Sequence, residues 1–248
     1  MNQTGGTAIT FDFHNTLVHC DAWFDLEVRR LASAFIEWRD ARDGAPARDG
    51  RRRAADEAYR RLRQRVIETG QERPAAACVA AVLAELGEPV DDGEIATAAE
   101  HLMRVPLAEV RLVAGAAETV RTIADAGVKL GVVSSAVYHP FLEWSLDRLG
   151  LGEFFATIIT SASAGFYKSR PEVYWHAADA LGVAPHRVVH VGDSYRFDVE
   201  GARRAGLTPV WLCADAAAHA AAEPPVLTLS TLEGSAPTLL RVLRSLVA

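Results

Sequence analysis

Residues 8–17 read Ala-Ile-Thr-Phe-Asp-Phe-His-Asn-Thr-Leu, and this stretch decides the fold. Its apolar, β-branched and aromatic start predicts a buried strand, and the chain then carries Asp12 into a turn. Because open parallel sheets bind ligands at the carboxyl ends of their strands, Asp12 stands where such a sheet presents a nucleophile. Two interpretations of Asp12 are open: a catalytic carboxylate, or a residue that starts the turn or caps a helix near Asp21.

The pattern after this strand is helical as far as about residue 105. Within 23–38, apolar residues including Phe24, Val28 and Phe35 recur at three- and four-residue steps, which predicts one buried helical face. A turn-rich connector over 43–50 follows. Further helices are expected at 51–69, 74–86 and 92–103, where Gly or Pro residues end the pattern.

The helix expected at 51–69 is rich in arginine. Acidic residues interleave with the arginines, namely Asp56, Glu57 and Glu68. We therefore expect a solvated face with ion pairs one helical turn apart, rather than a surface that binds anions.

From residue 110 onward, helices and strands alternate. Helices are expected at 116–126, 141–149, 171–181 and 199–205, and strands at 128–133, 156–160, 187–191 and 209–212. This order predicts an α/β fold with a doubly wound parallel sheet covered on both faces. The core then comprises residues 1–20 and 108–248, with the helical stretch 21–107 inserted into it. The alanine-rich stretch 214–222 is expected to form a surface loop or a short helix.

Composition excludes several classes of protein. A chain of 248 residues with 50% apolar content can bury one sizeable core. The formal net charge of −6 gives no overall attraction to nucleic acid or to an anionic membrane. The start of the chain lacks the pattern of an export signal, no apolar run is long enough for a membrane span, and three scattered cysteines form no metal-ligand pattern. We expect a cytoplasmic protein with reduced thiols.

Polar residues gather where the expected strands end. The first strand is followed by Asp12, His14, Asn15 and Thr16; the second by Ser134 and Ser135; a later loop carries Lys168 ahead of Pro171; and the fourth strand leads to Asp193, Ser194 and Asp198. Each residue has a plainer interpretation, since Ser134 can simply end a strand, Lys168 can be a surface cation, and an Asp can cap the helix near Val199. A cap accounts for one Asp and not for the whole set.

Together these motifs resemble the haloacid dehalogenase-like superfamily, most of whose members are magnesium-dependent phosphohydrolases. The family's first motif, Asp-x-Asp-Gly-Thr, corresponds to residues 12–16, and its second, a strand ending in Ser or Thr, to Val132-Val133-Ser134. The third, a Lys with Pro shortly after it, is matched by Lys168, and the fourth, Gly-Asp-Ser-x-x-x-Asp, by residues 192–198. The resemblance covers the whole chain, with 21–107 in the place of the family's helical cap.

The resemblance implies a role for each site residue. Asp12 is the expected nucleophile, Ser134 donates to a phosphoryl oxygen, and Lys168 neutralises charge. The expected Mg²⁺ ligands are Asp12, the backbone carbonyl of His14, Asp193 and Asp198, the last acting on metal-bound water, and the expected substrate contacts are Asn15, Thr16 and Ser135. The chemistry is coherent, because an anion that approaches a carboxylate needs a cation and fixed donors, and Mg²⁺ prefers oxygen ligands.

The chain departs from the family at two positions. His14 replaces the Asp that serves the phosphatases as acid and base, and Asn15 replaces Gly. Asn tolerates the left-handed backbone better than most residues, and any residue at position 14 offers a carbonyl. Three outcomes are open: His14 takes over proton transfer, since an ordinary imidazole titrates near about 6.5; the enzyme is slow or limited to good leaving groups; or the protein has lost catalysis and binds a ligand.

The resemblance therefore implies Mg²⁺-dependent hydrolysis of a small phosphorylated metabolite, a phosphate ester or an acyl phosphate, through an aspartyl-phosphate intermediate. The alternatives are a catalytically weak or silent binding or regulatory protein, and a metal-independent 2-haloacid dehalogenase, which has no need of Asp193 and Asp198. Of the other histidines, His190 is expected to be a core residue. Tyr195, Arg196 and Phe197 are within the fourth motif and are candidates to reach the substrate.

Overall fold

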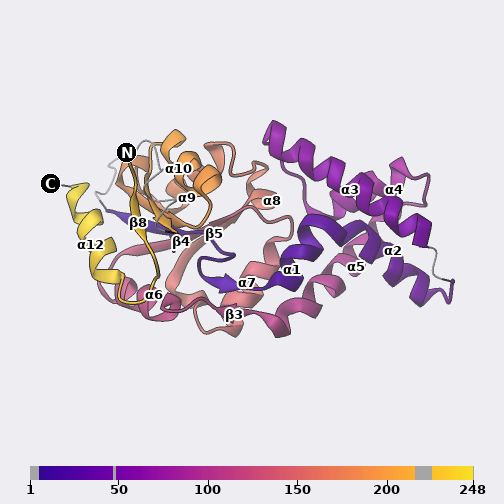
Figure 1. Ribbon diagram of the computed structural model, residues 1–248, viewed down its shortest axis with the longest axis horizontal. Helices are drawn as coiled ribbons and strands as arrows, with labels where there is room; N and C mark the ends of the chain where they lie inside the picture. Colours follow the sequence, from indigo (N-terminus) through magenta and orange to yellow (C-terminus); the bar gives the residue numbers. More distant parts are fainter. Residues whose placement is uncertain (1–5, 47–48, 216–224, 248) are drawn as a thin grey trace.

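The computed structural model describes residues 6–46, 49–215 and 225–247. The molecule is elongated, with a sheet and its covering helices at one end and a group of helices at the other (Figure 1). Most of the alanine-rich stretch, residues 216–222, lies outside the described residues.

A six-stranded sheet forms the centre of the larger part. All its neighbouring strands are parallel, in the order β5-β4-β1-β6-β7-β8. Their bounds are Ala8–Phe11 (β1), Lys129–Ser134 (β4), Phe155–Thr160 (β5), Val188–Gly192 (β6), Thr208–Leu212 (β7) and Leu227–Leu229 (β8). The predicted α/β fold with a parallel sheet is confirmed, and β1 lies between β4 and β6, so that Asp12 emerges near the middle of the sheet.

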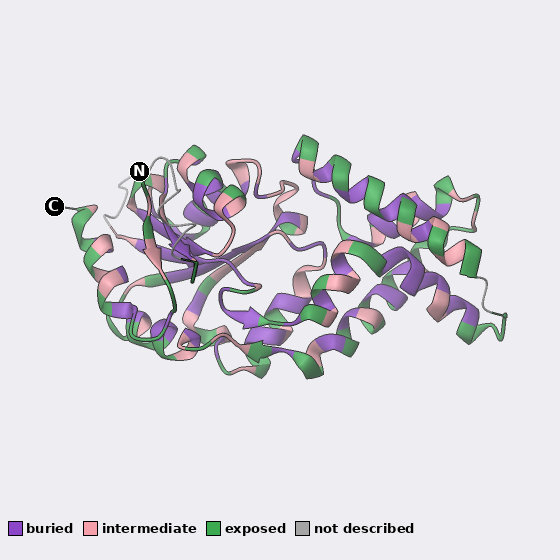
Figure 2. Cartoon of the chain, viewed as in Figure 1, coloured by how far each residue is buried: buried purple, intermediate pink, exposed green. Residues whose placement is uncertain are grey.

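Helices cover both faces of this sheet. One face packs against α6 (Ala116–Asp125), α7 (His139–Arg148) and α12 (Ala236–Ser245), and the other against α9 (Glu172–Leu181) and α10 (Glu200–Arg204). Side chains alternate along β1: Ile9 and Phe11 belong to the large core with α6 and α12, whereas Ala8 belongs to a second core under α9. Because both faces are covered, the central strands β1, β4 and β6 are buried along most of their length, whereas the edge strands β5 and β8 are more exposed (Figure 2).

The chain leaves and re-enters this core through a two-stranded antiparallel ribbon, β2 (Val18–His19) and β3 (Arg111–Leu112). The described residues between these strands form five α-helices, one π-helical turn and one 3₁₀ turn, which together we call the helical unit. It comprises α1 (Asp21–Asp25), a π-helical turn (Leu26–Arg30), α2 (Leu31–Arg42), α3 (Asp49–Thr69), α4 (Ala75–Glu85), α5 (Asp92–Arg104) and a 3₁₀ turn (Val105–Glu109). The domain bounds 1–20, 21–107 and 108–248 stay a prediction.

Shorter elements complete the core. They are α8 (Ser161–Ala164), 3₁₀ turns at Gly152–Phe154 and Pro185–Arg187, and a π-helical turn at Tyr195–Val199 that precedes α10. In the part of the chain that the structure describes, no helix combines the length and apolar character that a membrane span requires. Cys20 and Cys78 are buried thiols that form no disulfide.

The expectation of one helix with one buried face over 23–38 was wrong in two respects. The π-helical turn interrupts it, and Phe24 is 41% exposed while Val28 is partly exposed. The reason is tertiary: this end of the segment lines a cavity, whereas Leu31 and Phe35 pack into the core of the helical unit.

The ion-pair partners expected for the arginines of α3 were also wrong. Arg51 pairs with Glu88, and Arg63 pairs with Glu72, which lies beyond the end of α3. These acids come from other parts of the chain because α3 packs against α2 and α4, which brings distant carboxylates to its flanks. The expected solvated face is present at four arginines of α3, whereas Arg63 is buried. The four exposed residues are Arg53, Arg60, Arg61 and Arg65.

Candidate active site

Three carboxylates and one ammonium group converge at the carboxyl edge of the sheet. Asp12 follows β1, Asp193 follows β6, and Asp198 lies in the π-helical turn after β6. One carboxylate oxygen from each lies within 4.8 Å of the others, an arrangement that can hold a metal ion. Lys168 Nζ donates to Asp12 and, at 2.6 Å, to Asp198 Oδ1. The structure thus brings together four residues that are widely separated in the sequence.

Asp198 is held by several donors at once. His190 Nε2 donates to its Oδ1 at 3.1 Å, and the backbone N–H of Ser194 donates to its Oδ2 at 2.9 Å. Its carboxylate lies against Gly192, where an added Cβ would come within 2.2 Å of Asp198 Cγ. The fourth motif therefore needs Gly at 192 because a side chain there would occupy the space of Asp198.

His190 is fully buried, as expected for a core residue. Its Nδ1 lies 2.9 Å from Thr10 Oγ1, and since Nε2 faces the Asp198 carboxylate, we assign the proton to Nε2 and the acceptor role to Nδ1. His190 also orients Asp198, a role that the sequence did not indicate.

The cluster carries more negative than positive charge. Burial raises the pKa of Asp12 to about 8 against the lowering effect of Lys168, and burial together with Asp198 raises the pKa of Asp193 to about 6. Burial also opposes ionisation of Asp198, but Lys168 and His190 outweigh it and hold its pKa below the ordinary value. Burial opposes the charge of Lys168 too, yet Asp12 and Asp198 keep its pKa above the usual range. One ammonium among three acids leaves the site short of positive charge.

His14 lies on the side of the site that faces the helical unit. Its ring stacks on Phe24 with 4.6 Å between ring centroids and meets the edge of Trp23 at 5.8 Å. Nε2 is buried without a hydrogen-bond partner among the described residues, and Asp21 Oδ1 lies 3.8 Å away. Burial lowers the pKa of the imidazole, and Asp21 opposes that shift in part.

The turn after β1 contains the second departure from the family. Asn15 has φ of 61°, and it is the sole non-glycine residue with positive φ in the described ranges. The left-handed backbone predicted for Asn at this position is therefore present. Its side-chain oxygen accepts a hydrogen bond from His19 Nδ1 at 3.0 Å.

The remaining expected site residues divide into two groups. Ser134 and Ser135 line the same cavity as Asp12, and Ser135 Oγ accepts from the backbone N–H of Lys168 at 3.3 Å. Thr16 is fully buried and is not part of the cavity lining. Its hydroxyl has no hydrogen-bond partner within the described ranges, and its role in substrate binding stays a prediction.

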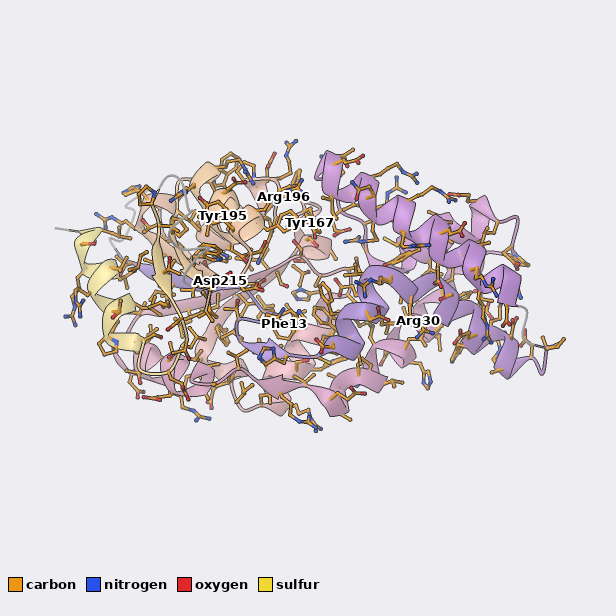
Figure 3. The ribbon with its side chains drawn as sticks, in the orientation of Figure 1. Phe13, Arg30, Tyr167, Tyr195, Arg196 and Asp215 are labelled. Carbon is orange, nitrogen blue, oxygen red and sulfur yellow. The ribbon has the colours of Figure 1, made fainter. Side chains whose placement is uncertain are left out.

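A cavity of about 370 Å³ joins the cluster to the helical unit. Its lining also includes residues that the sequence did not single out as functional, namely Trp23, Phe24, Val28, Arg63, Ile67 and Tyr167. Tyr167 lies at the junction between the core and the helices (Figure 3). The signal in the sequence that could have identified some of these residues is helical spacing. Phe24 and Val28 lie one turn apart on one side of a helix, and so do Arg63 and Ile67.

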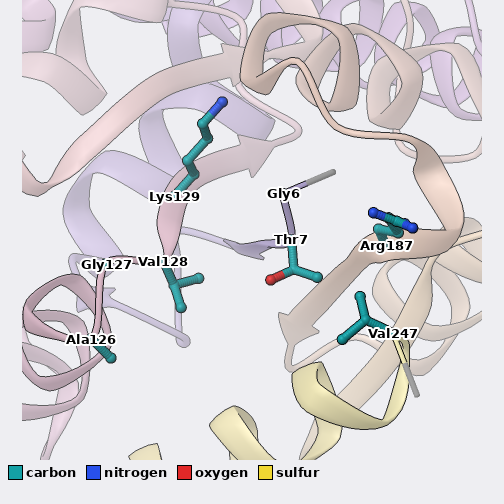
Figure 4. Close-up of a pocket in the computed structure, with 8 residues that line it drawn as sticks. All are labelled: Gly6, Thr7, Ala126, Gly127, Val128, Lys129, Arg187 and Val247. Atoms are coloured by element: carbon teal, nitrogen blue, oxygen red, sulfur yellow. The ribbon is translucent and has the colours of Figure 1, made fainter. Parts of the chain in front are cut away.

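A second hollow lies at the amino ends of the strands. Figure 4 shows it between the start of β1 and the start of β4, with Lys129 and Arg187 among its lining residues. Lys129 Nζ donates to the carbonyl of Leu181 at 2.7 Å. Because parallel sheets place their ligand sites at the carboxyl ends of the strands, we assign the chemistry to the cavity that contains Asp12.

Comparison with known proteins identifies the family of the chain. The model of the haloacid dehalogenase-like hydrolase family matches residues 7–206. The chain belongs to this family. The matched range contains the complete cluster and the helical unit, so the resemblance inferred from the four motifs is confirmed.

Related proteins match part of the chain in sequence. A glyceraldehyde 3-phosphate phosphatase of Methanopyrus kandleri is 31% identical over 156 residues, which is 62% of this chain and 65% of that protein. The haloacid dehalogenase-like hydrolase domain-containing protein 3 of Bos taurus is 39% identical over 93 residues, 38% of this chain and 36% of the relative. In each case the match spans less than two thirds of the relative.

Solved structures of the family share the fold over nearly the full chain. A 2-haloacid dehalogenase from Pseudomonas syringae pv. Tomato DC3000 superposes with a TM-score of 0.68 at 22% identity, covering 96% of this chain and 99% of the other. A HAD phosphatase from Thermococcus onnurineus gives a TM-score of 0.61 at 20% identity, covering 94% and 97%. At these identities the similarity establishes the fold, which dehalogenases and phosphatases of the family have in common.

Proposed function

We propose that this protein is a Mg²⁺-dependent phosphohydrolase that acts on a small phosphorylated metabolite through an aspartyl-phosphate at Asp12. The observation that supports this most directly is the convergence of Asp12, Asp193 and Asp198 around Lys168. The phosphatase named among the relatives points the same way. A dehalogenating Asp would need no such set of additional acids.

The donor set fits a divalent cation. Three carboxylates are hard oxygen ligands, and burial, together with the charges of Asp198 and Asp193, raises the pKa of Asp12 despite Lys168, an effect that a divalent cation would offset. We propose Asp12, Asp193 and the carbonyl of His14 as direct ligands of Mg²⁺. Both oxygens of Asp198 already accept hydrogen bonds, so Asp198 would add its negative charge to the cation site while it orients Lys168. When bound, Mg²⁺ supplies the positive charge that lets a phosphate dianion approach a carboxylate.

Each residue of the site has a separate role in the proposed reaction. A carboxylate oxygen of Asp12 attacks phosphorus as the bond to the leaving oxygen breaks, and water later cleaves the aspartyl-phosphate to release phosphate and restore Asp12. Lys168 and Ser134 donate to the phosphoryl oxygens. His14 protonates the leaving oxygen in the first step and takes a proton from the attacking water in the second.

The test is a panel of phosphate esters and acyl phosphates assayed with and without Mg²⁺ on wild type, Asp12→Asn and His14→Asp. We expect wild-type turnover with Mg²⁺, loss of at least about 10³-fold in kcat for Asp12→Asn, and retained turnover for His14→Asp. Asp179→Asn, an exposed substitution on α9, is the matched control and should behave as wild type. Wild-type protein that turns over nothing in the panel would disprove the phosphatase assignment.

Two other functions remain as alternatives. Release of chloride from a 2-haloacid without Mg²⁺ would indicate a dehalogenase, the activity in the name of the Pseudomonas syringae protein whose fold this chain shares. Binding of a phosphate ester without turnover would indicate a silent binding or regulatory protein, which His14 favours. The cytoplasmic location and the absence of nucleic-acid and membrane partners stay predictions.

A further inference from the structure

The cavity has two chemically different sides. Toward the sheet it is lined by the carboxylates, Lys168, Ser134 and Ser135. Its other lining residues include apolar side chains, namely Phe24, Val28 and Ile67 from the helical unit and Phe197 from the π-helical turn after β6. We call these four residues the apolar wall. If phosphate occupies the first side, the leaving group of the substrate must lie against the second.

The cations in the described lining are already paired. Lys168 bonds to Asp12 and Asp198. Arg63 donates through both terminal nitrogens to the Glu72 carboxylate, at 2.6 and 2.9 Å, and both side chains are buried. This pair uses two of the five N–H donors of the guanidinium and neutralises its charge. A leaving group with its own carboxylate or phosphate would therefore find no cation on this side of the cavity whose charge is not already neutralised.

The wall also offers little to a polyhydroxylated leaving group. The four side chains of the apolar wall have no hydrogen-bonding atoms, so a substrate hydroxyl placed against them would lose water without gaining a partner. Beside the wall, Trp23 Nε1 is a single buried donor without a partner among the described residues, which is fewer donors than a polyhydroxylated group requires. Phe24 is 41% exposed and Ile67 is partly exposed, which leaves apolar surface for a ligand to cover. A cavity of about 370 Å³ accommodates a phosphate with a leaving group of modest size.

We propose that the apolar wall selects phosphate monoesters whose leaving group is uncharged and apolar, such as the ester of an aromatic or short alkyl alcohol. This selectivity rests on the phosphatase function proposed above. It excludes bisphosphates, phosphorylated carboxylic acids and sugar phosphates as preferred substrates. The wall thereby determines substrate choice, while the cluster at the sheet performs the chemistry.

The first test compares pairs of esters that differ in one property. Propyl phosphate and glycerol 3-phosphate release primary alcohols of equal chain length that differ in their hydroxyls. Benzyl phosphate and 4-carboxybenzyl phosphate differ in charge. With wild-type enzyme and Mg²⁺, we expect kcat/KM to be at least about tenfold higher for the apolar member of each pair. Acetyl phosphate, whose leaving group is too small to cover the wall, reports the chemistry alone.

The second test places a cation in the wall. Ile67 lies one turn after Arg63 on α3, so Ile67→Lys adds a positive charge next to an arginine already neutralised by Glu72. We expect the ratio of kcat/KM for 4-carboxybenzyl to benzyl phosphate to rise at least about tenfold in this variant. Gln64→Lys adds the same charge at an exposed position of α3 outside the cavity lining, and it should leave that ratio at the wild-type value.

The outcomes separate this inference from the function beneath it. Suppose that acetyl phosphate is hydrolysed, but glycerol 3-phosphate is preferred over propyl phosphate, or 4-carboxybenzyl phosphate over benzyl phosphate. The wall then does not select apolar leaving groups, and this inference is wrong while the proposed phosphatase function is retained. An equal change of the ratio in Ile67→Lys and Gln64→Lys would also overturn it. If no ester and no acyl phosphate is hydrolysed, both proposals fall together.

Discussion

His14 has an environment unlike that of a solvent-exposed acid or base. Its ring is stacked between the site and Phe24, and its Nε2 is enclosed next to Asp21. Burial lowers the pKa of His14 below its ordinary value, so the imidazole is neutral over most of the neutral range and protonated at more acidic pH. A histidine that donates its proton to a leaving oxygen must therefore work best in acid.

The first prediction concerns His14→Ala. We expect kcat/KM, which reports formation of the aspartyl-phosphate, to fall about 10²- to 10⁴-fold for alkyl phosphates and much less for 4-nitrophenyl phosphate, because nitrophenolate leaves without a proton. The wild-type kcat/KM for alkyl phosphates should decline as the pH rises through the lowered pKa of His14, and the variant should lack this limb. His101→Ala, on an exposed part of α5, is the control. Equal losses for both leaving groups would contradict an acid role.

The second prediction concerns Gly192→Ala. The added methyl group would lie 2.2 Å from Asp198 Cγ, so the carboxylate must move away from Lys168 and His190. We expect kcat to fall about 10²-fold, the scale of a 1 Å misplacement of a catalytic group. Gly50→Ala, where a Cβ meets no atom within 4 Å, should leave kcat unchanged. Wild-type activity in Gly192→Ala would show that Asp198 is free to shift.

At the scale of the elements, the π-helical turn Leu26–Arg30 explains how one segment serves both the core and the cavity. The wider turn directs Glu27 into the interior, while Val28 reaches the cavity lining. Such turns often occur at functional sites. Helix α3 has a similar double role, since its apolar stripe packs the helical unit while Arg63 and Ile67 face the cavity.

The third prediction concerns the pairing of Arg63 with Glu72. Glu72 also accepts from Ser161 Oγ at 2.8 Å, so this carboxylate connects α3 to the core. Glu72→Gln leaves a buried guanidinium without its counter-ion, and we expect the free energy of unfolding to fall by about 3–5 kcal/mol in urea titrations. Glu85→Gln, which breaks the exposed pair with Arg61, should cost less than about 1 kcal/mol. Equal costs would refute a structural role for the buried pair.

At the scale of the whole molecule, the helical unit is connected to the core by hydrogen bonds in addition to the two-stranded ribbon. The segment that joins α3 to α4 exchanges backbone hydrogen bonds with the core, Tyr167 N–H to Gly70 C=O at 3.0 Å and Glu72 N–H to Gly165 C=O at 3.0 Å. Glu27 adds a further link, since its Oε1 accepts from the backbone N–H of Val137 at 3.0 Å. Its other oxygen is buried without a partner among the described residues.

The fourth prediction is a pH dependence of stability that originates at Glu27. Burial raises its pKa to about 8, against the lowering effect of Arg63, whereas the unfolded chain releases the same proton near 4.5. Between these values the folded state binds the extra proton, so the free energy of unfolding must fall as the pH rises from 4.5 to 8.

Glu27→Gln removes this titration. Relative to the variant, wild type should lose up to about 1.4 kcal/mol per pH unit across that window, as measured by urea unfolding at several pH values in Mg²⁺-free buffer. Glu37→Gln, a partly exposed change in α2, should follow the wild-type profile. A constant difference between wild type and Glu27→Gln would place the pKa of Glu27 near its ordinary value.

The sequence alone determined the parallel α/β architecture and which polar residues gather at the carboxyl ends of the strands, because strand and helix periodicity and the four motifs are local signals. Asn15 was likewise predictable, since the turn needs a residue that accepts positive φ. The tertiary structure alone decided that Phe24 and Val28 face a cavity, that Arg63 is buried against Glu72, and that His190 orients Asp198. Each of these depends on which distant residues pack against a side chain, and periodicity along one segment does not contain that information.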